Sequence, residues 1–427
     1  TAREQALALR SEGVDLVVVL SHSGIRKQAD GLWGEGDIDL LREVPEIDVI
    51  VGGHSHTVLK EPLKVDGRLC LQAGSDTKYL GELTLFRDGE RWAMDSYTLH
   101  PIDDSIGGDP LITAFVGELQ EEVTHRVLEP AGYDFEQVLA ESPRTLTRAI
   151  DDHVLGNLVT DALRVAASAD VSMSGSGALR ADVWRGRTGL QRTSDLFRIM
   201  GLGIGTIDDS PGYAVVKGWV TGRDLKDVFE FLLIGYQLKG KDYYPRISGA
   251  QVTYNNNRVP FDRVVTIAIG DDSGGYVPAD IDDDTLYSAA FSTYVGSFLP
   301  QVSKLSYGLL DVTMRHEDGT PAETLDDLLF DVEPNRQGVQ ELKGYKALFD
   351  YVAALPDHDG DGIPELPHEG PAATERLIQA NSWAPAAMLT NATWKMWVVM
   401  VLPMVFIVAI VFVIALLRRR WQSTRDG

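Results

Sequence analysis

The chain has 427 residues, 44% of them hydrophobic, which is enough to build the cores of two or three domains. Asp and Glu outnumber Lys and Arg by 63 to 39, and the resulting net charge of −24 disfavours binding to a phosphate backbone. We therefore expect no nucleic-acid partner. A small phosphorylated ligand is still compatible with this charge, because a metal and a few arginines can reverse the local field. Cys70 is the single cysteine, so no intrachain disulfide can form.

Residues 1–108 alternate helix and strand patterns and then turn to antiparallel strands. Helices are predicted over 2–12 and 37–44, and buried strands over 15–20 and 47–53. Three more strands are predicted in RLCLQAG, LGELTLFRDGE and RWAMDSYTLH, which are accompanied by Asp-Gly turn signals. The opening helix is typical of the middle of a domain. We therefore expect these residues to be the C-terminal part of an α/β domain.

A connecting helix is predicted within 109–139, ahead of a second domain over 140–354. LGNLVTDALRVAASA has the apolar spacing of a helix, and ADVSMSGSGALRAD predicts a strand that runs into a Gly/Ser loop. YAVVKGWV predicts a strand, followed by a helix that begins at Thr221, where Asp224 completes a capping box. Strands in SGAQVTYN and RVVTIAIG complete a domain of α+β class.

The C-terminal part carries the pattern of a membrane span. WVVMVLPMVFIVAIVFVIALL has 21 residues without a charge, the length that one transmembrane helix needs. Trp394 and Trp397 lie at the start of this run and three arginines follow it, as at the two membrane interfaces. We predict an acidic stalk over 355–394, a transmembrane helix over 395–420 and a cytoplasmic tail over 421–427. The protein is thus expected to be single-pass, with the lipid bilayer as a partner and most of the chain extracytoplasmic, in the periplasm or at the cell surface.

Two predicted strands end in histidines. VDLVVVLSHSG places His22 just beyond a buried strand, and VIVGGHSHT presents His54 and His56 after a Gly-Gly bend. Side chains at the carboxyl ends of neighbouring strands converge in open α/β sheets, and imidazole suits Zn, Mn, Fe or Ni. We therefore expect His22, His54 and His56 to be metal ligands, although His22 taken by itself is more typical of a capping or core histidine.

VDLVVVLSHSG followed by IDVIVGGHSHT resembles the last two metal motifs of the calcineurin-like metallophosphoesterases, in the 5′-nucleotidase / UDP-sugar hydrolase branch. LGNLVTDAL, SGSGALRAD, VVKGWVTGRDLKDVFE and YYPRISGAQVTY follow in the order of that family's C-terminal domain, so the resemblance covers roughly residues 1–300. It implies the C-terminal part of a four-layered metallophosphoesterase sandwich and then an α+β substrate-binding domain.

The resemblance also implies two divalent metal ions, Zn, Mn or similar, which support in-line attack on phosphorus. By the resemblance, His22 and His54 bind one metal and His56 binds the other. No D-x-H, G-D or G-N-H motif precedes His22. We therefore expect the chain to hold only part of the ligand set and to be inactive alone, with the catalytic residues lying before Thr1.

The same resemblance implies a nucleotide site in the second domain, in which arginine grips phosphate and two aromatics hold the base. The substrate-binding residues that it implies are Arg180, Arg148, Ser174, Leu202 and Tyr294. Ser174 lies beside Gly175, where the family has asparagine, and Arg148 is near a second arginine position. Leu202 replaces one aromatic, and Tyr294 or Phe298 substitutes for the other.

DHDGDGIPE predicts a calcium loop of the EF-hand type. Asp357, Asp359 and Asp361 alternate ahead of a glycine, and Glu365 stands at the ninth position. The twelfth position is His368 rather than a bidentate glutamate. A plain acidic linker is the alternative.

Taken together, these patterns predict a membrane-anchored extracytoplasmic phosphoesterase that hydrolyses nucleotides or related phosphate esters. The alternative is a non-catalytic cell-surface relative that binds a ligand. The replaced aromatics favour the binding protein, whereas the intact GGHSH motif favours the enzyme.

Overall fold

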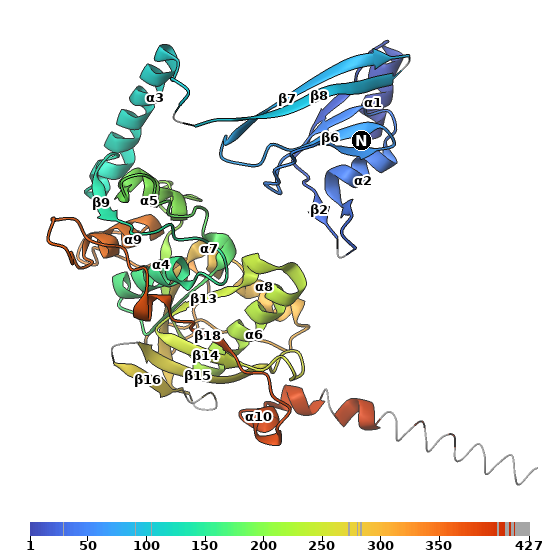
Figure 1. The fold of residues 1–427 in the computed structure, drawn as a ribbon. Coiled ribbons are helices and arrows are strands. Elements are labelled where there is room, and N and C mark those ends of the chain that lie inside the picture. Colours follow the sequence, from blue (N-terminus) through green and yellow to red (C-terminus); the bar gives the residue numbers. More distant parts are fainter. Residues whose placement is uncertain are drawn as a thin grey trace, which may run out of the picture. The chain divides into compact units, whose positions relative to one another are not determined.

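The computed structural model describes residues 1–427 except 29, 90, 104, 272–273, 280, 282–283, 399–400, 406–409, 411–413 and 415–427. The chain divides into two compact units, Thr1–Val116 and Gly117–Gly427 (Figure 1). The boundary falls within α3 (Pro110–Val123), which is the predicted connecting helix.

The first unit is built on a four-stranded sheet in the order β1-β4-β6-β5. β1 (Val18–Leu20), β4 (Val49–Val51) and β6 (Arg68–Leu71) are parallel, and β5 (Leu63–Val65) is antiparallel to β6. A short hairpin of β2 (Arg26–Lys27) and β3 (Trp33–Gly34) follows β1 in the chain. Because the three parallel strands end at the same edge, the residues that follow them can meet there.

The alternation of side chains along the strands gives this sheet two apolar faces. Ile50 and Cys70 share a core with residues of α1 (Ala2–Ser11) and α2 (Gly36–Glu43). Val49 and Leu69 pack instead against the long hairpin of β7 (Tyr79–Asp88) and β8 (Arg91–Pro101). The predicted helix and strand order of this part of the chain is confirmed.

Among its described residues, the second unit holds two four-stranded sheets and a strand pair. The first sheet contains β12 (Val215–Thr221), β17 (Leu286–Ser292), β10 (Val171–Gly175) and β13 (Pro245–Ser248), and the second contains β16 (Gly275–Pro278), β15 (Val264–Asp271), β14 (Ala250–Tyr254) and β18 (Leu377–Gln379). β9 (Val138–Glu141) pairs with β11 (Leu190–Arg192). The helices are α4 (His153–Ala166), α5 (Thr193–Met200), α6 (Gly222–Lys239), α7 (Thr293–Gly296), α8 (Leu299–Leu305), α9 (Gly344–Ala353) and α10 (Pro385–Leu389).

Two apolar cores organise this unit. Residues of α4, α5 and α9 share one core, and residues of α6 share the other with β12, β15 and β17. α6 begins at the predicted capping box: Asp224 N donates to Thr221 Oγ1 at 3.2 Å, and Thr221 N donates to Asp224 Oδ2 at 2.9 Å. The α+β class predicted for this region is confirmed.

Residues 355–394 differ from the predicted stalk, because they pack onto the second unit. β18 extends the second sheet beside β14. Arg376 donates to both carboxylate oxygens of Asp161, at 2.7 and 3.1 Å, and Asn157 donates to the carbonyl of Thr374 at 3.0 Å. The Pro- and Gly-rich composition reflects irregular backbone here rather than separation from the core.

The predicted transmembrane helix, 395–420, lies largely outside the described residues, and the tail, 421–427, lies wholly outside them. Residues 394–398 and 401–405 are helical. Within the part of the chain that the structure describes, no helix is both long enough and apolar enough to cross a bilayer.

Glu230 is a fully buried carboxyl group in α6 that should make the stability of the second unit depend on pH. Its Oε1 accepts from Val264 N at 2.6 Å, and burial raises the pKa of Glu230 to about 7. The unfolded pKa is about 4.3, so the folded state binds more protons between these two values, and stability falls as pH rises from about 4.3 to 7. A shift of this size corresponds to roughly 4 kcal/mol.

Replacing Glu230→Gln should therefore remove most of that fall and raise the urea midpoint at pH 8 more than at pH 5. Unfolding in urea across this pH range measures the effect. The exposed Glu317→Gln is a matched control that should leave the profile unchanged. An unaltered profile in Glu230→Gln would contradict the assignment.

Candidate functional site

His22 and His54 lie close together at the carboxyl edge of β1 and β4, which we call the histidine edge. Their ring centroids are 5.3 Å apart and their planes are inclined at 71°. An imidazole nitrogen lies about 2.0–2.1 Å from Zn, so two rings on one ion have centres roughly 5 Å apart. The spacing of His22 and His54 therefore fits a shared ion. His56 follows two residues later, and all three histidines lie at least partly open to solvent.

The two glycines ahead of His54 are required by close packing rather than by backbone conformation. A Cβ on Gly52 would overlap a carboxylate oxygen of Asp37, and one on Gly53 would lie 2.9 Å from His22 Nδ1. The left-handed conformations fall instead on His54 (φ 67°) and His56 (φ 52°). Such backbone costs of order 1 kcal/mol per residue and clusters at functional sites.

Gln72, which directly follows β6, holds the histidine loop in place. Its buried side-chain oxygen accepts from Thr57 N at 2.5 Å and from Ser55 Oγ at 2.8 Å, and its amide donates to the Gly53 carbonyl. Ser55 Oγ also accepts from Ile25 N at 3.2 Å, which ties in the loop after β1. Sequence reasoning missed Gln72, although its place after a parallel strand is the signal that identified the histidines.

Asp37 is a buried carboxylate beneath this edge. One oxygen accepts from Ser21 Oγ, whereas Oδ2 has no hydrogen-bond partner among the described residues. Burial, together with the charge of Asp37, raises the pKa of Cys70 to about 12. Asp37 lies under the histidine loop, since a Cβ on Gly52 would meet its Oδ2. In the described part of the chain, however, Asp37 and the three histidines do not bring three ligand atoms within 4.8 Å of one another. The paired imidazoles of His22 and His54 therefore offer two ligands of a divalent metal site.

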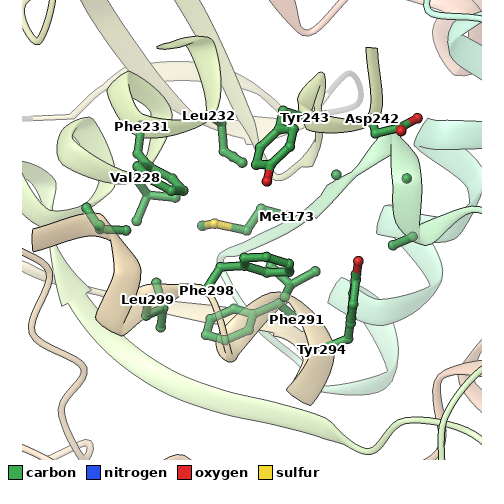
Figure 2. A pocket seen from close by; sticks show the side chains of 15 residues that line it. Met173, Val228, Phe231, Leu232, Asp242, Tyr243, Phe291, Tyr294, Phe298 and Leu299 are labelled. Carbon is green, nitrogen blue, oxygen red and sulfur yellow. The ribbon is translucent and has the colours of Figure 1, made fainter. Parts of the chain in front are cut away.

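A mainly apolar cavity of about 230 Å³ lies in the second unit beside the loop that carries Arg180. Gly177 and Ala178 line it, and Arg180 Nη1 donates to the Gly177 carbonyl at 3.2 Å. In Figure 2, Tyr243 reaches in from one side, while Phe291 and Phe298 close the opposite side. The Arg180 side chain is exposed, so its guanidinium can meet a ligand at this loop.

The structure brings only some of the predicted substrate residues to this cavity. Tyr294 lines it, as does Phe298, whose ring lies 5.2 Å from Tyr294 and nearly perpendicular to it. Ser174 is buried within β10 and is not part of the lining. Sequence reasoning did not name Tyr243 as a site residue, although Tyr243 opens the YYPRISGAQVTY segment; it comes from the short turn Lys241–Tyr243 ahead of β13.

Arg148 and Leu202 lie around the cavity rather than in its lining. Arg148 Nε donates to Asp182 at 3.2 Å, which places it near Arg180 but engages its guanidinium. The Leu202 carbonyl accepts from Tyr213 N at 3.1 Å, and the Tyr213 ring stacks on Tyr294 at 5.3 Å. Tyr213 therefore covers a face of Tyr294, a role that the sequence did not predict.

The predicted calcium loop gathers its carboxylates. Asp357, Asp359 and Asp361 have oxygens within 4.8 Å of one another, and Asp359 and Glu365 form a second such group with Glu141 of β9. A backbone hydrogen bond holds Glu141 next to the acidic loop, because Glu141 N donates to the Pro364 carbonyl at 2.8 Å. Glu141 was not predicted, because it lies more than 200 residues away in the chain. Calcium binding stays a prediction.

If the loop binds calcium, 1 mM Ca²⁺ should raise the melting temperature of the second unit by several degrees. Saturation to 100 times Kd adds about 2.7 kcal/mol, and each kcal/mol shifts Tm by about 2–4 °C in a unit of this size. Asp359→Asn should abolish the rise, since Asp359 belongs to both groups. Glu369→Gln, a neighbouring exposed carboxylate, is the control. An equal rise in all three proteins would exclude this loop.

Comparisons with known proteins agree with this architecture. Residues 135–298 match the family model described as 5′-nucleotidase, C-terminal domain. This match covers less than half of the chain, and it identifies a 5′-nucleotidase C-terminal domain within the second unit. It is 23% identical to the trifunctional nucleotide phosphoesterase protein YfkN of Bacillus subtilis, over 70% of this chain and 19% of that protein. It is 26% identical to a 5′-nucleotidase of Diplobatis ommata, over 61% of this chain and 46% of that protein.

The fold is also found in a solved structure. The 5′-nucleotidase precursor of Thermus thermophilus superposes with a TM-score of 0.55 at 18% identity, covering 89% of this chain and 67% of that one. The mixed α/β fold is thus shared with a 5′-nucleotidase. The chain spans half or less of the length of the curated relatives named above.

Proposed function

We propose that this chain forms part of a metal-dependent phosphoesterase of 5′-nucleotidase type, acting on nucleotides or related phosphate esters. The pairing of His22 and His54 at the histidine edge is the observation that carries the proposal. The relatives named as nucleotide phosphoesterases and 5′-nucleotidases support the same reaction class.

Each unit has a distinct part in this proposal. His22, His54 and His56 would hold two divalent ions, and Gln72 and Ser55 would keep the histidine loop in its ligating conformation. Bound metals of this kind polarise phosphoryl oxygens and activate water. In the second unit, the Arg180 guanidinium would contact phosphate, and the adjacent cavity would take the organic group of the ester.

We further propose that the protein is anchored by residues 395–420 and that both units lie outside the cytoplasm. The uncharged run and the arginines after it support this orientation. A short basic cytoplasmic tail would follow the span.

The decisive experiment measures phosphate release by the full-length protein, with and without Mn²⁺ or Zn²⁺. Nucleotides, UDP-sugars and simple aryl phosphates make up the panel, since the lining of the cavity is largely apolar. Metal-dependent release from any of them supports the enzyme. Ligand binding without release from any substrate would favour the non-catalytic surface relative, as the altered aromatic positions suggest.

A further inference from the structure

The segment just ahead of the apolar run is fastened to the second unit by buried charges. Asp262 is fully buried and binds two cations, Lys226 Nζ at 2.7 Å and Arg258 Nη2 at 2.6 Å. Lys395 forms a second buried pair with Asp227 of α6. Their side chains are all at most 7% exposed. We call these five residues the ionic tie.

The ionic tie holds the backbone of residues 390–395 directly. Lys226 Nζ donates to the Asn391 carbonyl at 2.9 Å, and Arg258 Nη1 donates to the Thr390 carbonyl at 3.0 Å. Thr393 N and Oγ1 both donate to Asp262, at 3.2 and 3.1 Å. Residues 394–398 are already helical, and Met396 is 1% exposed. The chain therefore leaves the folded unit at Trp397, so no flexible linker separates the folded unit from the apolar run.

The segment that leads to this exit exposes large apolar side chains and carries no acidic residue of its own. Trp383, Trp394 and Trp397 are 74%, 58% and 51% exposed, and Leu389 of α10 is also exposed. Although the chain carries 63 acidic residues, none falls within 376–425. Exposed tryptophans are favoured at the headgroup level of a bilayer, and a segment without carboxylates adds no repulsion of its own from anionic lipids.

We infer that the second unit lies directly on the membrane surface, with Trp383, Trp394 and Trp397 inserted among the lipid headgroups. This inference rests on the membrane anchoring proposed above. Because the ionic tie fixes where the chain leaves the unit, the lipid side of the unit is then the side of α10, which lies beside the last described helical turns (Figure 1). Asn255, just after β14, lies on the same side, since its Nδ2 donates to the Ser382 carbonyl at 2.8 Å. A unit on a flexible stalk would leave Trp383, which lies 14 residues before Trp397, in water.

Site-specific fluorescence on the full-length chain tests this orientation. A nitrobenzoxadiazole dye is attached to Trp383→Cys in vesicles of phosphatidylcholine and phosphatidylglycerol, with nitroxide-labelled headgroups as quencher. Cys70 is buried, so the added thiol is the one that reacts. The matched control is Trp184→Cys, an exposed tryptophan of the same unit that lies outside the C-terminal segment. We expect at least twofold stronger quenching at position 383 than at 184.

Flotation of the vesicles separates this inference from the anchoring itself. Chain that floats with the lipid but is quenched equally at both positions overturns the docked orientation and leaves the anchor intact. Chain that does not float overturns both. Lys395→Gln should float while losing the extra quenching at 383, and Lys395→Arg should restore it. Circular dichroism identifies a variant that fails to fold, in which case the comparison of positions 383 and 184 decides alone.

Discussion

Asp262→Ala is expected to lower the free energy of unfolding of the second unit by about 3–5 kcal/mol, the cost of breaking a buried ion pair from one side. The substitution leaves Lys226 and Arg258 buried without their shared carboxylate. It also removes the acceptor of two hydrogen bonds from Thr393. Urea unfolding measures the change, since urea is uncharged and does not screen ion pairs.

Glu333→Ala provides the matched control in the same unit. Glu333 pairs with Arg336 at 3.6 Å, and both side chains are more than half exposed, so the change should stay below about 1 kcal/mol. Asp262→Ala could instead lower the free energy of unfolding no more than Glu333→Ala does. In that case Lys226 and Arg258 would not depend on the Asp262 carboxylate, and the ionic tie would not hold the C-terminal segment. A loss of several kcal/mol would show that Lys226 and Arg258 depend on this buried carboxylate.

The sequence predicts those features of the fold that depend on local pattern. The capping box at Thr221 and Asp224 follows from residues three apart in the chain, and it sets the start of α6. His22 and His54 were predicted because each follows an apolar strand, and parallel pairing of β1 with β4 brings such positions together. Local spacing was sufficient for the capping box, whereas the approach of the two histidines also needed the pairing of β1 with β4, and their role as metal ligands stays a prediction.

Features that depend on distant pairing were not predicted. Glu141 reaches the acidic loop only because its backbone pairs with residues near Glu365. Residues 355–394 have the composition of a linker, yet Arg376 finds its carboxylate partner in α4. The hydrophobic pattern of a segment predicts which of its own residues are buried. It does not predict which distant strand or helix that segment will contact, and the contacts of Glu141 and Arg376 depend on such distant elements.

The histidine edge carries the second large expected effect. His54→Ala should reduce metal-dependent phosphate release by the full-length protein by more than about 100-fold, since loss of a residue that merely supports a ligand already costs 10–100-fold. The substitution removes one of the two paired imidazoles and leaves His22 without its neighbour at 5.3 Å. It should also weaken Zn²⁺ or Mn²⁺ binding in a direct titration.

Two further variants make this result specific. His100→Ala removes an exposed histidine of the same unit, whose Nε2 lies 2.7 Å from Glu82 across the β7–β8 hairpin, and it should leave phosphate release and metal affinity unchanged. Gln72→Ala should give a rate of phosphate release between those of His54→Ala and His100→Ala. It removes the hydrogen bonds that hold the loop at Thr57 and Ser55, but it does not remove a metal ligand. Full activity in His54→Ala would remove the histidine edge from the chemistry. We expect a large loss of phosphate release in His54→Ala, a smaller loss in Gln72→Ala and no loss in His100→Ala. That pattern would mean that metal-dependent catalysis needs both the His54 imidazole and the loop conformation that Gln72 holds.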